Sequence, residues 1–152
     1  MLMLLFHLGQ SQYAIPAQEV VEVTPQVELE PIAKAPGYIR GLFDYRGQNV
    51  PVVDLRQVIH NRHCNDSLTT RVILVRFPLS CGETRTLGLL AERVTETVRI
   101  KADSFSDTGV RIPDTPYLGQ ATRHDTGLIQ KVNVKNLLPE AVQLLLFPAR
   151  AG

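Results

Sequence analysis

The chain has 152 residues, of which 44% are hydrophobic and 20% are charged, and its formal net charge is +1. This length suits one domain with an apolar core, and the composition is that of a folded globular protein. Because the net charge is close to zero, the composition argues against a protein whose overall field gathers nucleic acid or an anionic membrane.

From the N-terminus onward, short apolar segments alternate with turn signals, which is the rhythm of β-strands. The first apolar run lacks the basic flank of a signal peptide and is too short to span a membrane, so we expect a strand there. Residues 46–49 (RGQN) predict a tight hairpin. The expected strands are residues 2–6, 13–15, 41–45, 49–55, 71–77, 86–91, 94–100 and 128–134.

Helical signals are sparse. Residues 16–23 favour a helical turn because their first residue, a proline, suits the first position of a helix. Asp54 resembles an N-cap that precedes a short helix, and residues 134–147 predict a helical tail. Residues 101–120, rich in Asp, Ser, Thr, Gly and Pro, predict a long exposed loop. These features together predict an all-β class of small barrels or a sandwich.

Two Asp-Thr-Gly triplets, at residues 107–109 and 125–127, match the sequence around the carboxylates of aspartic proteases. Such a dyad needs two carboxylates that share one proton, each on a loop buried by apolar strands. Here the flanking residues are polar, and Asp107 and Asp125 are too close in sequence for a separate lobe around each. We therefore interpret both triplets as turns, in which aspartate and glycine are common.

His60, His63 and Cys64 form a cluster of residue types that bind transition metals. A structural zinc site needs four ligands, and the other histidines and cysteine lie in no paired ligand motif. We therefore expect a solvated loop with no metal and no cofactor. The sequence also lacks a nucleophile elbow and a phosphate-binding glycine loop. A small hydrolase or metal-binding enzyme that uses these three residues, or Asp107 and Asp125, stays open as the alternative function.

Residues 41–56, GLFDYRGQNVPVVDLR, place an arginine at the tip of an otherwise apolar hairpin. Two strands meet at Arg46 and Gly47, so the guanidinium projects near the tip while apolar residues supply the walls. Arginine is always charged and presents a planar fork of donors, which suits it to recognition. An isolated surface arginine contributes little by itself, so its role depends on the rest of the chain.

Three segments of this region resemble the signature of the CheW family of chemotaxis coupling proteins. They are residues 38–41 (YIRG), 45–47 (YRG) and 50–56 (VPVVDLR), in the family's order and spacing, and the likeness extends over nearly the whole chain. The resemblance implies a non-enzymatic adaptor without a cofactor. Its partners are the cytoplasmic tip of a methyl-accepting chemoreceptor and the regulatory domain of a CheA-type histidine kinase. It implies no nucleic acid and no direct membrane insertion.

The resemblance also implies a fold and a location. The fold is mainly β, with two SH3-like five-stranded β-barrels, short helices and a C-terminal helix in one CheW-like domain. The location is the cytoplasm, which the two cysteines fit because they define no disulfide framework. The approximate ranges are 1–152 for the domain, 9–65 for the first barrel, 66–134 for the second, with strand exchange near the termini, and 135–147 for the helix.

A set of partner-binding residues follows from the same resemblance. An apolar groove with a few placed charges suits the amphipathic helices of a receptor tip. Within this groove we expect Arg46 to pair with Glu22, while plain core packing is the alternative for Val20 and Val98. The expected binding residues are Val20, Glu22 and Val23 from the helical turn, Gly41 beside it, Arg46 and Gly47 from the hairpin, and Val98 from the second barrel.

Departures from the family pattern indicate a specialised paralogue with its own receptor. Asp44 and Tyr45 stand where the family usually has a short aliphatic or Asn-Leu pair. Arg71 begins a strand where an apolar residue is common, and His124 and Asp125 lie in a late hairpin. The chain also begins directly at its first strand. We expect a role in a surface-sensing or pilus pathway instead of the main swimming pathway.

Overall fold

The structure is a computed structural model that describes residues 1–110, 112–125 and 127–148, without the side chain of residue 95. The strands are β1 (Leu2–Leu8), β2 (Ser11–Pro16), β3 (Val20–Pro25), β4 (Ile39–Tyr45), β5 (Gln48–Asp54), β6 (Arg71–Pro78), β7 (Thr84–Arg99), β8 (Ser106–Asp107), β9 (Gln120–His124) and β10 (Gly127–Lys131). The α-helices are α1 (Leu55–His60) and α2 (Glu140–Leu146). The 3-10 helices are Ala17–Glu19, Ala102–Ser104 and Val134–Asn136.

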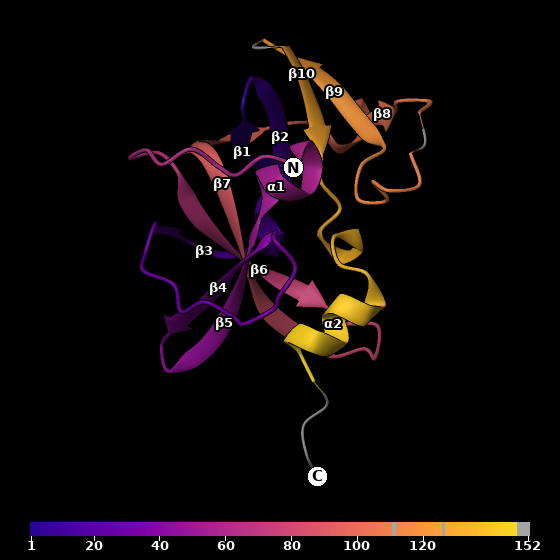
Figure 1. Cartoon of the computed structure of the whole chain (residues 1–152). Coiled ribbons are helices and arrows are strands. Elements are labelled where there is room, and N and C mark those ends of the chain that lie inside the picture. Colours follow the sequence, from indigo (N-terminus) through magenta and orange to yellow (C-terminus); the bar gives the residue numbers. More distant parts are fainter. Residues whose placement is uncertain (111, 126, 149–152) are drawn as a thin grey trace.

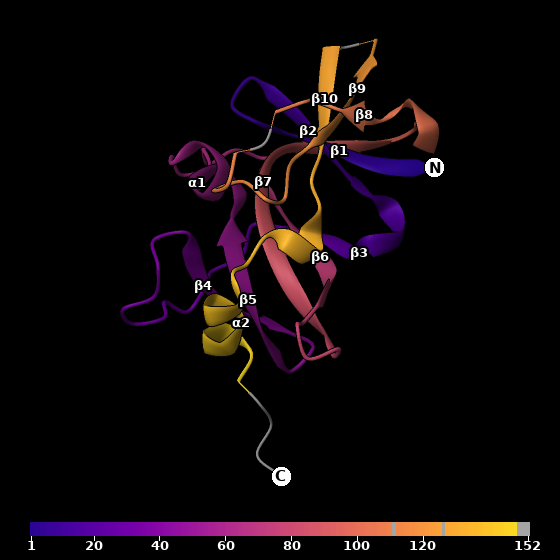
Figure 2. The same cartoon turned by 90° about the vertical axis from the view of Figure 1, so that its right-hand side faces the viewer.

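Two sets of strands share the long strand β7. In the first set the order is β3, β6, β7, β5, β4, and only β5 and β7 are parallel. In the second set the order is β7, β1, β2, β10, β9, β8, and only β2 and β10 are parallel. Figure 1 and Figure 2 show β4 and β5 at one end of the molecule and β8, β9 and β10 at the other. The expected all-β class with few helices is confirmed, while the two SH3-like barrels stay a prediction.

The strand pairing crosses the boundary that we predicted between residues 65 and 66. β6 and the first part of β7 pair with β3 and β5, whereas β1 and β2 pair with the end of β7 and with β10. Residues 86–91 and 94–100, predicted as two strands, are nearly all one strand, because β7 continues past a register shift opposite β1. Arg93, with a positive φ of 48°, lies at this shift. Sequence order therefore does not separate the two sets of strands.

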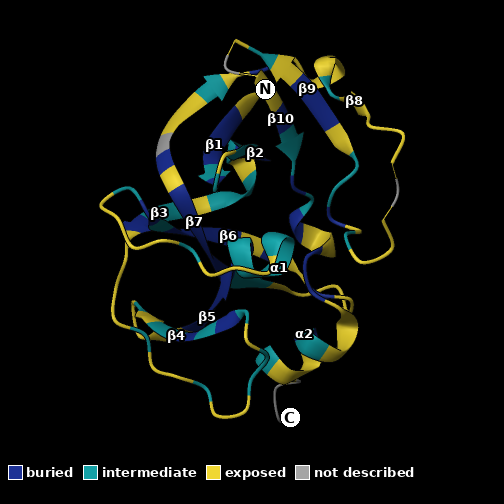
Figure 3. Ribbon diagram, turned by 45° about the horizontal axis from the view of Figure 1, so that its top comes forward, coloured by how far each residue is buried: buried dark blue, intermediate teal, exposed yellow. Residues whose placement is uncertain are grey.

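The largest core cluster lies between the two sets and joins them. It contains Phe6 and Tyr13 from the second set, Ile73 and Leu89 from the first, and Leu55 from α1. Smaller clusters lie around Met3 on β1 and around Val52 on β5. Figure 3 shows buried positions along the strands and exposed positions along the long connections. The main cluster therefore joins the two sets, while each set also has a smaller cluster of its own.

The helical predictions are correct in part. Asp54 caps α1 as expected, since its side chain accepts a hydrogen bond from the Gln57 N–H. The helical turn predicted over residues 16–23 is wrong beyond its first turn, because the 3-10 helix Ala17–Glu19 gives way to β3. The β-branched valines there favour a strand, and β6 supplies the pairing partner. None of the helices in the described ranges has the length and hydrophobicity that a bilayer crossing requires.

Candidate binding surface

The tip of the β4–β5 hairpin is a two-residue turn at Arg46 and Gly47. Both residues have positive φ, 52° and 81°, which is the combination of a type I′ turn, whose twist matches that of paired strands. Asp44 closes the turn, because its Oδ1 accepts a hydrogen bond from the Gly47 N–H at 3.1 Å. The predicted tight hairpin is confirmed. Since 76% of the Arg46 side chain is exposed, the guanidinium projects into solvent from a rigid support.

Arg46 and Tyr45 share one acceptor on β3, the carboxylate of Glu22. The Glu22 Oε1 accepts a hydrogen bond from the Tyr45 hydroxyl at 3.0 Å and one from the Arg46 Nη2 at 3.4 Å. The guanidinium carbon also lies 5.1 Å from the centre of the Tyr45 ring, a cation–π contact. The predicted pairing of Arg46 with Glu22 is confirmed. The part played by Tyr45 was missed, although a tyrosine beside the tip arginine was a signal for it.

We call Glu22, Tyr45 and Arg46 the Glu22 clasp. β3 and β4 are the two edge strands of the first set, and in the described residues no backbone ladder joins them. The clasp links these edges through side chains alone. The side chain of Glu22 is 41% exposed, so the ion pair with Arg46 contributes at most about 1 kcal/mol to stability. The clasp therefore positions the guanidinium more than it stabilises the fold.

Gly41 and Gly47 each have a structural reason to be glycine. Gly41 has a φ of 142°, and a Cβ built there would lie 2.5 Å from the carbonyl oxygen of Glu30. Glu30 and Leu42 exchange two backbone hydrogen bonds, at 2.8 and 2.9 Å, so this close approach is fixed. Gly47 faces open space and serves the positive φ of the turn. Any contact of either glycine with a partner stays a prediction.

The three valines expected at the surface are partly buried against the core. Val20 and Val23 pack on the main cluster, and Val98 packs on the cluster around Met3. Val98 pairs with Met3, which in turn pairs with Pro16, the residue before the first 3-10 helix. Val98, Met3 and Pro16 lie side by side on three adjacent strands, so Val98 lies two strand spacings, about 10 Å, from the start of that helix. The structure thus brings Val98 towards the segment that carries Val20, and its role in binding stays a prediction.

Asp54, from the signature segment, acts inside the fold. Its side chain is fully buried, and it accepts hydrogen bonds from the backbone N–H groups of Gln57 at 3.1 Å and Cys64 at 3.0 Å. The Nη1 of Arg40 lies 3.2 Å from the same carboxylate. The Nδ1 of His63 lies 3.5 Å away. Asp54 therefore ties β4, the start of α1 and the segment after α1 to the end of β5.

Arg56 forms a second buried ion pair, with Glu92 on β7. The Arg56 Nη1 donates to the Glu92 Oε2 at 2.9 Å, and the two side chains are only 12% and 9% exposed. The same carboxylate accepts hydrogen bonds from the N–H groups of Gly9 at 2.8 Å and Asn65 at 2.6 Å. Burial alone would raise the pKa of Glu92, but these N–H groups and Arg56 bind its charged form and hold the pKa below its usual value. This pair links both strand sets to α1.

His60, His63 and Cys64 do not form a metal site. The His60 Nε2 lies 3.0 Å from the Tyr13 hydroxyl, whereas His63 lies beside Asp54. The Cys64 side chain packs against the core, and burial raises the pKa of its thiol, which disfavours the thiolate that a metal needs. Within the described ranges no three His, Cys, Asp or Glu side chains are placed to hold a metal ion. The structure does not support the metal-binding alternative.

The two Asp-Thr-Gly triplets do not form a dyad. Asp107 on β8 lies opposite Gln120, the first residue of β9, whereas Asp125 follows the last residue of β9. Five residues of strand therefore separate the two positions, about 16 Å. The Oδ1 of Asp107 accepts a hydrogen bond from the Gly109 N–H at 2.7 Å, which is turn chemistry. Residue 126 lies outside the described residues. The positions of Asp107 and Asp125 therefore give no support to the hydrolase alternative.

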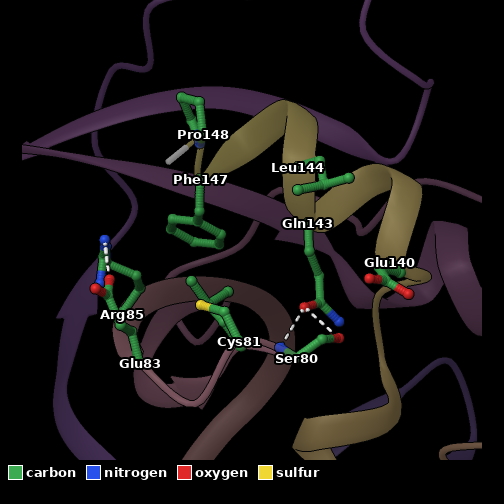
Figure 4. Close-up of a pocket in the computed structure, with 10 residues that line it drawn as sticks. Ser80, Cys81, Glu83, Arg85, Glu140, Gln143, Leu144, Phe147 and Pro148 are labelled. Carbon is green, nitrogen blue, oxygen red and sulfur yellow. Dashed lines mark hydrogen bonds and ion pairs between the residues drawn. The ribbon is translucent and has the colours of Figure 1, made fainter. Parts of the chain in front are cut away.

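A hollow of about 330 Å³ lies between α2 and the loop that joins β6 to β7 (Figure 4). Gln143 points from α2 to this loop, and its Oε1 accepts hydrogen bonds from the backbone N–H and the hydroxyl of Ser80 at 3.1 and 3.2 Å. Its Nε2 donates to the carbonyl oxygen of Leu138 at 3.0 Å. These bonds dock α2 against the strands. Cys81 and Leu144 line the hollow, and its chemistry points to no ligand.

Comparisons with known proteins identify the family of the chain. A family model described as a CheW-like domain matches residues 2–142. The chain is 28% identical over 113 residues to a chemotaxis protein CheW of Helicobacter pylori and 29% identical over 102 residues to one of Klebsiella aerogenes. These matches cover 74% and 67% of this chain, and 66% and 58% of the two relatives. The chain thus matches less than two thirds of either relative.

A solved structure shares the fold. The crystal structure of the scaffolding protein TtCheW from Thermoanaerobacter tengcongensis superimposes with a TM-score of 0.80, over 91% of this chain and 87% of that one. The sequence identity is 24%, so this likeness concerns the fold alone. The family match, by contrast, covers nearly the whole sequence, including the hairpin and the buried signature residues. The chain belongs to the family of CheW-like domains.

Proposed function

We propose that this chain is a non-enzymatic signalling adaptor that couples the cytoplasmic tip of a methyl-accepting chemoreceptor to a CheA-type histidine kinase. The match to the CheW-like domain over residues 2–142 supports it, as do relatives that are chemotaxis proteins. The geometry adds that the residues with a catalytic appearance in the sequence serve turns and contacts within the fold. An adaptor needs surfaces instead, and the Glu22 clasp offers one.

The observation that carries the proposal is the exposed guanidinium of Arg46 on a rigid support. A type I′ turn, the Tyr45 ring and the Glu22 carboxylate hold it in place before a partner arrives. Binding by a preorganised group loses less conformational entropy than binding by a free side chain. Several of its N–H donors remain available, and they suit a carboxylate or a row of carbonyl oxygens on a partner.

The remaining expected residues complete the proposed surface. Val20, Val23 and Val98 supply partly buried apolar area, while Gly41 and Gly47 shape the backbone beside the clasp. A receptor tip made of amphipathic helices would bury its apolar stripe on such a surface and place an acidic or carbonyl group on Arg46. Both proposed partners act in the cytoplasm, so we place the adaptor there.

The test is co-sedimentation of the purified chain with a receptor tip fragment and a CheA-type kinase. We expect the wild-type chain to increase the kinase found with the receptor fragment. Arg46→Ala should weaken this coupling by about tenfold or more, since buried arginines often dominate interfaces. Its melting temperature should fall by no more than about 4 °C, because an exposed ion pair contributes at most about 1 kcal/mol.

Arg123→Ala is the matched control, because it removes an exposed arginine from β9, at the other end of the molecule (Figure 1). It should leave the coupling unchanged. A wild-type chain that fails to bring kinase and receptor together would refute the adaptor function. A large drop in the melting temperature of the Arg46 variant would show that Arg46 is structural.

We also propose that the chain serves a specialised pathway, such as surface sensing or pilus motility. This proposal rests on Asp44 and Tyr45, which depart from the family pattern. Asp44 closes the hairpin turn, and Tyr45 forms part of the Glu22 clasp. A receptor adapted to this chain should contact the Tyr45 hydroxyl as well as Arg46. Tyr45→Phe should then reduce coupling to the chain's own receptor and spare coupling to a swimming receptor. Equal loss with both receptors would contradict the specialisation.

A further inference from the structure

A polar hollow of about 470 Å³ lies between the β1–β2 turn, α1, the segment after α1 and the middle of β7. It is far richer in positive charge than the chain as a whole, whose net charge is +1. Three arginines line it, Arg56, Arg62 and Arg93. The other lining residues are Gly9, Gln10, Asn65, Ser67, Thr69, Thr70 and Glu92.

We call this site the arginine hollow. Its acidic lining does not neutralise its positive charge. Glu92 is its one acidic lining residue, and Arg56 and two backbone N–H groups already bind that carboxylate. Three guanidinium groups and one carboxylate leave a net charge of +2. Asp66 lies on the adjoining loop and is not among the lining residues. Among the described residues, neither Arg62 nor Arg93 forms an ion pair within 4.0 Å.

Hydrogen bonds hold the walls of the hollow in place. The donors exposed to a ligand are the guanidinium groups of Arg62 and Arg93. The segment that carries the hydroxyl groups is rigid, because the Thr70 Oγ1 donates to the carbonyl oxygen of Asn65 at 2.6 Å. The Val94 N–H donates to the carbonyl oxygen of Thr69 at 3.0 Å, which fixes the other side of the segment to β7. Arg93 itself stands in the left-handed region, a conformation uncommon outside glycine.

We propose that the arginine hollow binds a dianion of the phosphate class. A phosphate group carries a charge close to −2 at neutral pH and several acceptor oxygens, which complements the net charge of +2 and the guanidinium donors. A single carboxylate would neutralise only half of this charge. No aromatic ring lines the hollow among the described residues, so nothing there would stack a nucleobase. The anion is inorganic phosphate or a phosphate monoester on another molecule, and both present the same oxygens.

The probe is inorganic phosphate, titrated into the full chain at pH 7.5 and constant ionic strength. Backbone amide shifts in two-dimensional NMR should change saturably around residues 9–10, 65–70 and 92–93. Arg62→Ala and Arg93→Ala should each weaken binding by about tenfold, the effect of losing one charge-assisted hydrogen bond. Both side chains are exposed, so both variants should fold. Arg56 is left intact because it also stabilises the fold.

Arg99→Ala is the matched control, since it removes an exposed arginine of β7 outside the hollow. It should bind phosphate as the wild-type chain does. A second titration with O-phosphoserine identifies the source: binding at least as tight as that of phosphate points to a carried monoester, and weaker binding points to the free ion. Amide shifts that do not saturate, or that are equal in all three variants, would overturn the proposal. Coupling of receptor and kinase tests the adaptor function separately.

Discussion

Replacing Asp54 by alanine removes the acceptor at the centre of the buried network. Three losses add up in the variant. Without its cap, α1 loses about 1 kcal/mol. The Cys64 N–H, bonded to Asp54 in the wild type, is left unpaired, which costs about 1–3 kcal/mol. Arg40 loses its carboxylate, but its side chain is 35% exposed, so this adds at most about 1 kcal/mol. We expect a total of about 2–5 kcal/mol.

Urea unfolding at pH 7, followed by circular dichroism, measures this loss. In a thermal melt, the melting temperature of a chain of this length should fall by on the order of 10 °C. Asp54→Asn is the matched control, since it keeps a side-chain oxygen for one of the two N–H groups and should lose about half as much. In native-state hydrogen exchange, the amides of Gln57 and Cys64 should lose protection first. A loss below about 1 kcal/mol in the alanine variant would refute the assignment of Asp54 as a structural centre.

Three further substitutions test other parts of the fold. Glu92→Gln should lose about 3–5 kcal/mol at pH 7, because Arg56 is left buried without its carboxylate. The folded-state pKa of Glu92 is lowered, so its contribution is fully present above the usual value of 4.5 and is lost as the pH falls through the folded-state pKa. The difference in stability between the two proteins should therefore shrink as the pH falls below 4.5. Gly41→Ala should lose about 1–3 kcal/mol in the same assay, from its positive φ and its contact with the Glu30 carbonyl. Gln143→Ala should lose about 1–3 kcal/mol and release α2 to faster hydrogen exchange, because Ser80 loses its acceptor.

Local signals in the sequence predicted the parts of the fold that depend on neighbours in the chain. The Arg46–Gly47 turn follows from a glycine, which tolerates positive φ, between two apolar runs. The cap at Asp54 follows from a short acidic side chain before a helical run. The pairing of Arg46 with Glu22 needed more than local reasoning, because the two residues lie on strands that no backbone ladder joins in the described residues. There the family resemblance supplied the prediction.

The parts of the fold that the sequence did not predict depend on pairing between strands that lie far apart in the chain. Residues 16–23 carry helical signals at their start, and only pairing with β6 selects a strand for the rest. The unity of β7 depends on two different partners, β6 and β1, along its length. In the same way, β2 pairs with β10, a strand from the end of the chain. Periodicity within a segment contains no information about which segment it will pair with.

The three arginines of the family signature differ in the carboxylates that they contact, and this difference shows which of them bears on partner binding. Arg40 and Arg56 contact buried carboxylates, those of Asp54 and Glu92, so their presence reports that the fold is intact. Among the described residues, the one carboxylate paired with Arg46 is that of the half-exposed Glu22, and the Arg46 side chain keeps most of its surface free. A chain that had kept the fold and lost its partners would still retain the first two. Evidence for coupling therefore rests on Arg46 and its clasp, whose removal should cost binding while the buried pairs keep the fold intact.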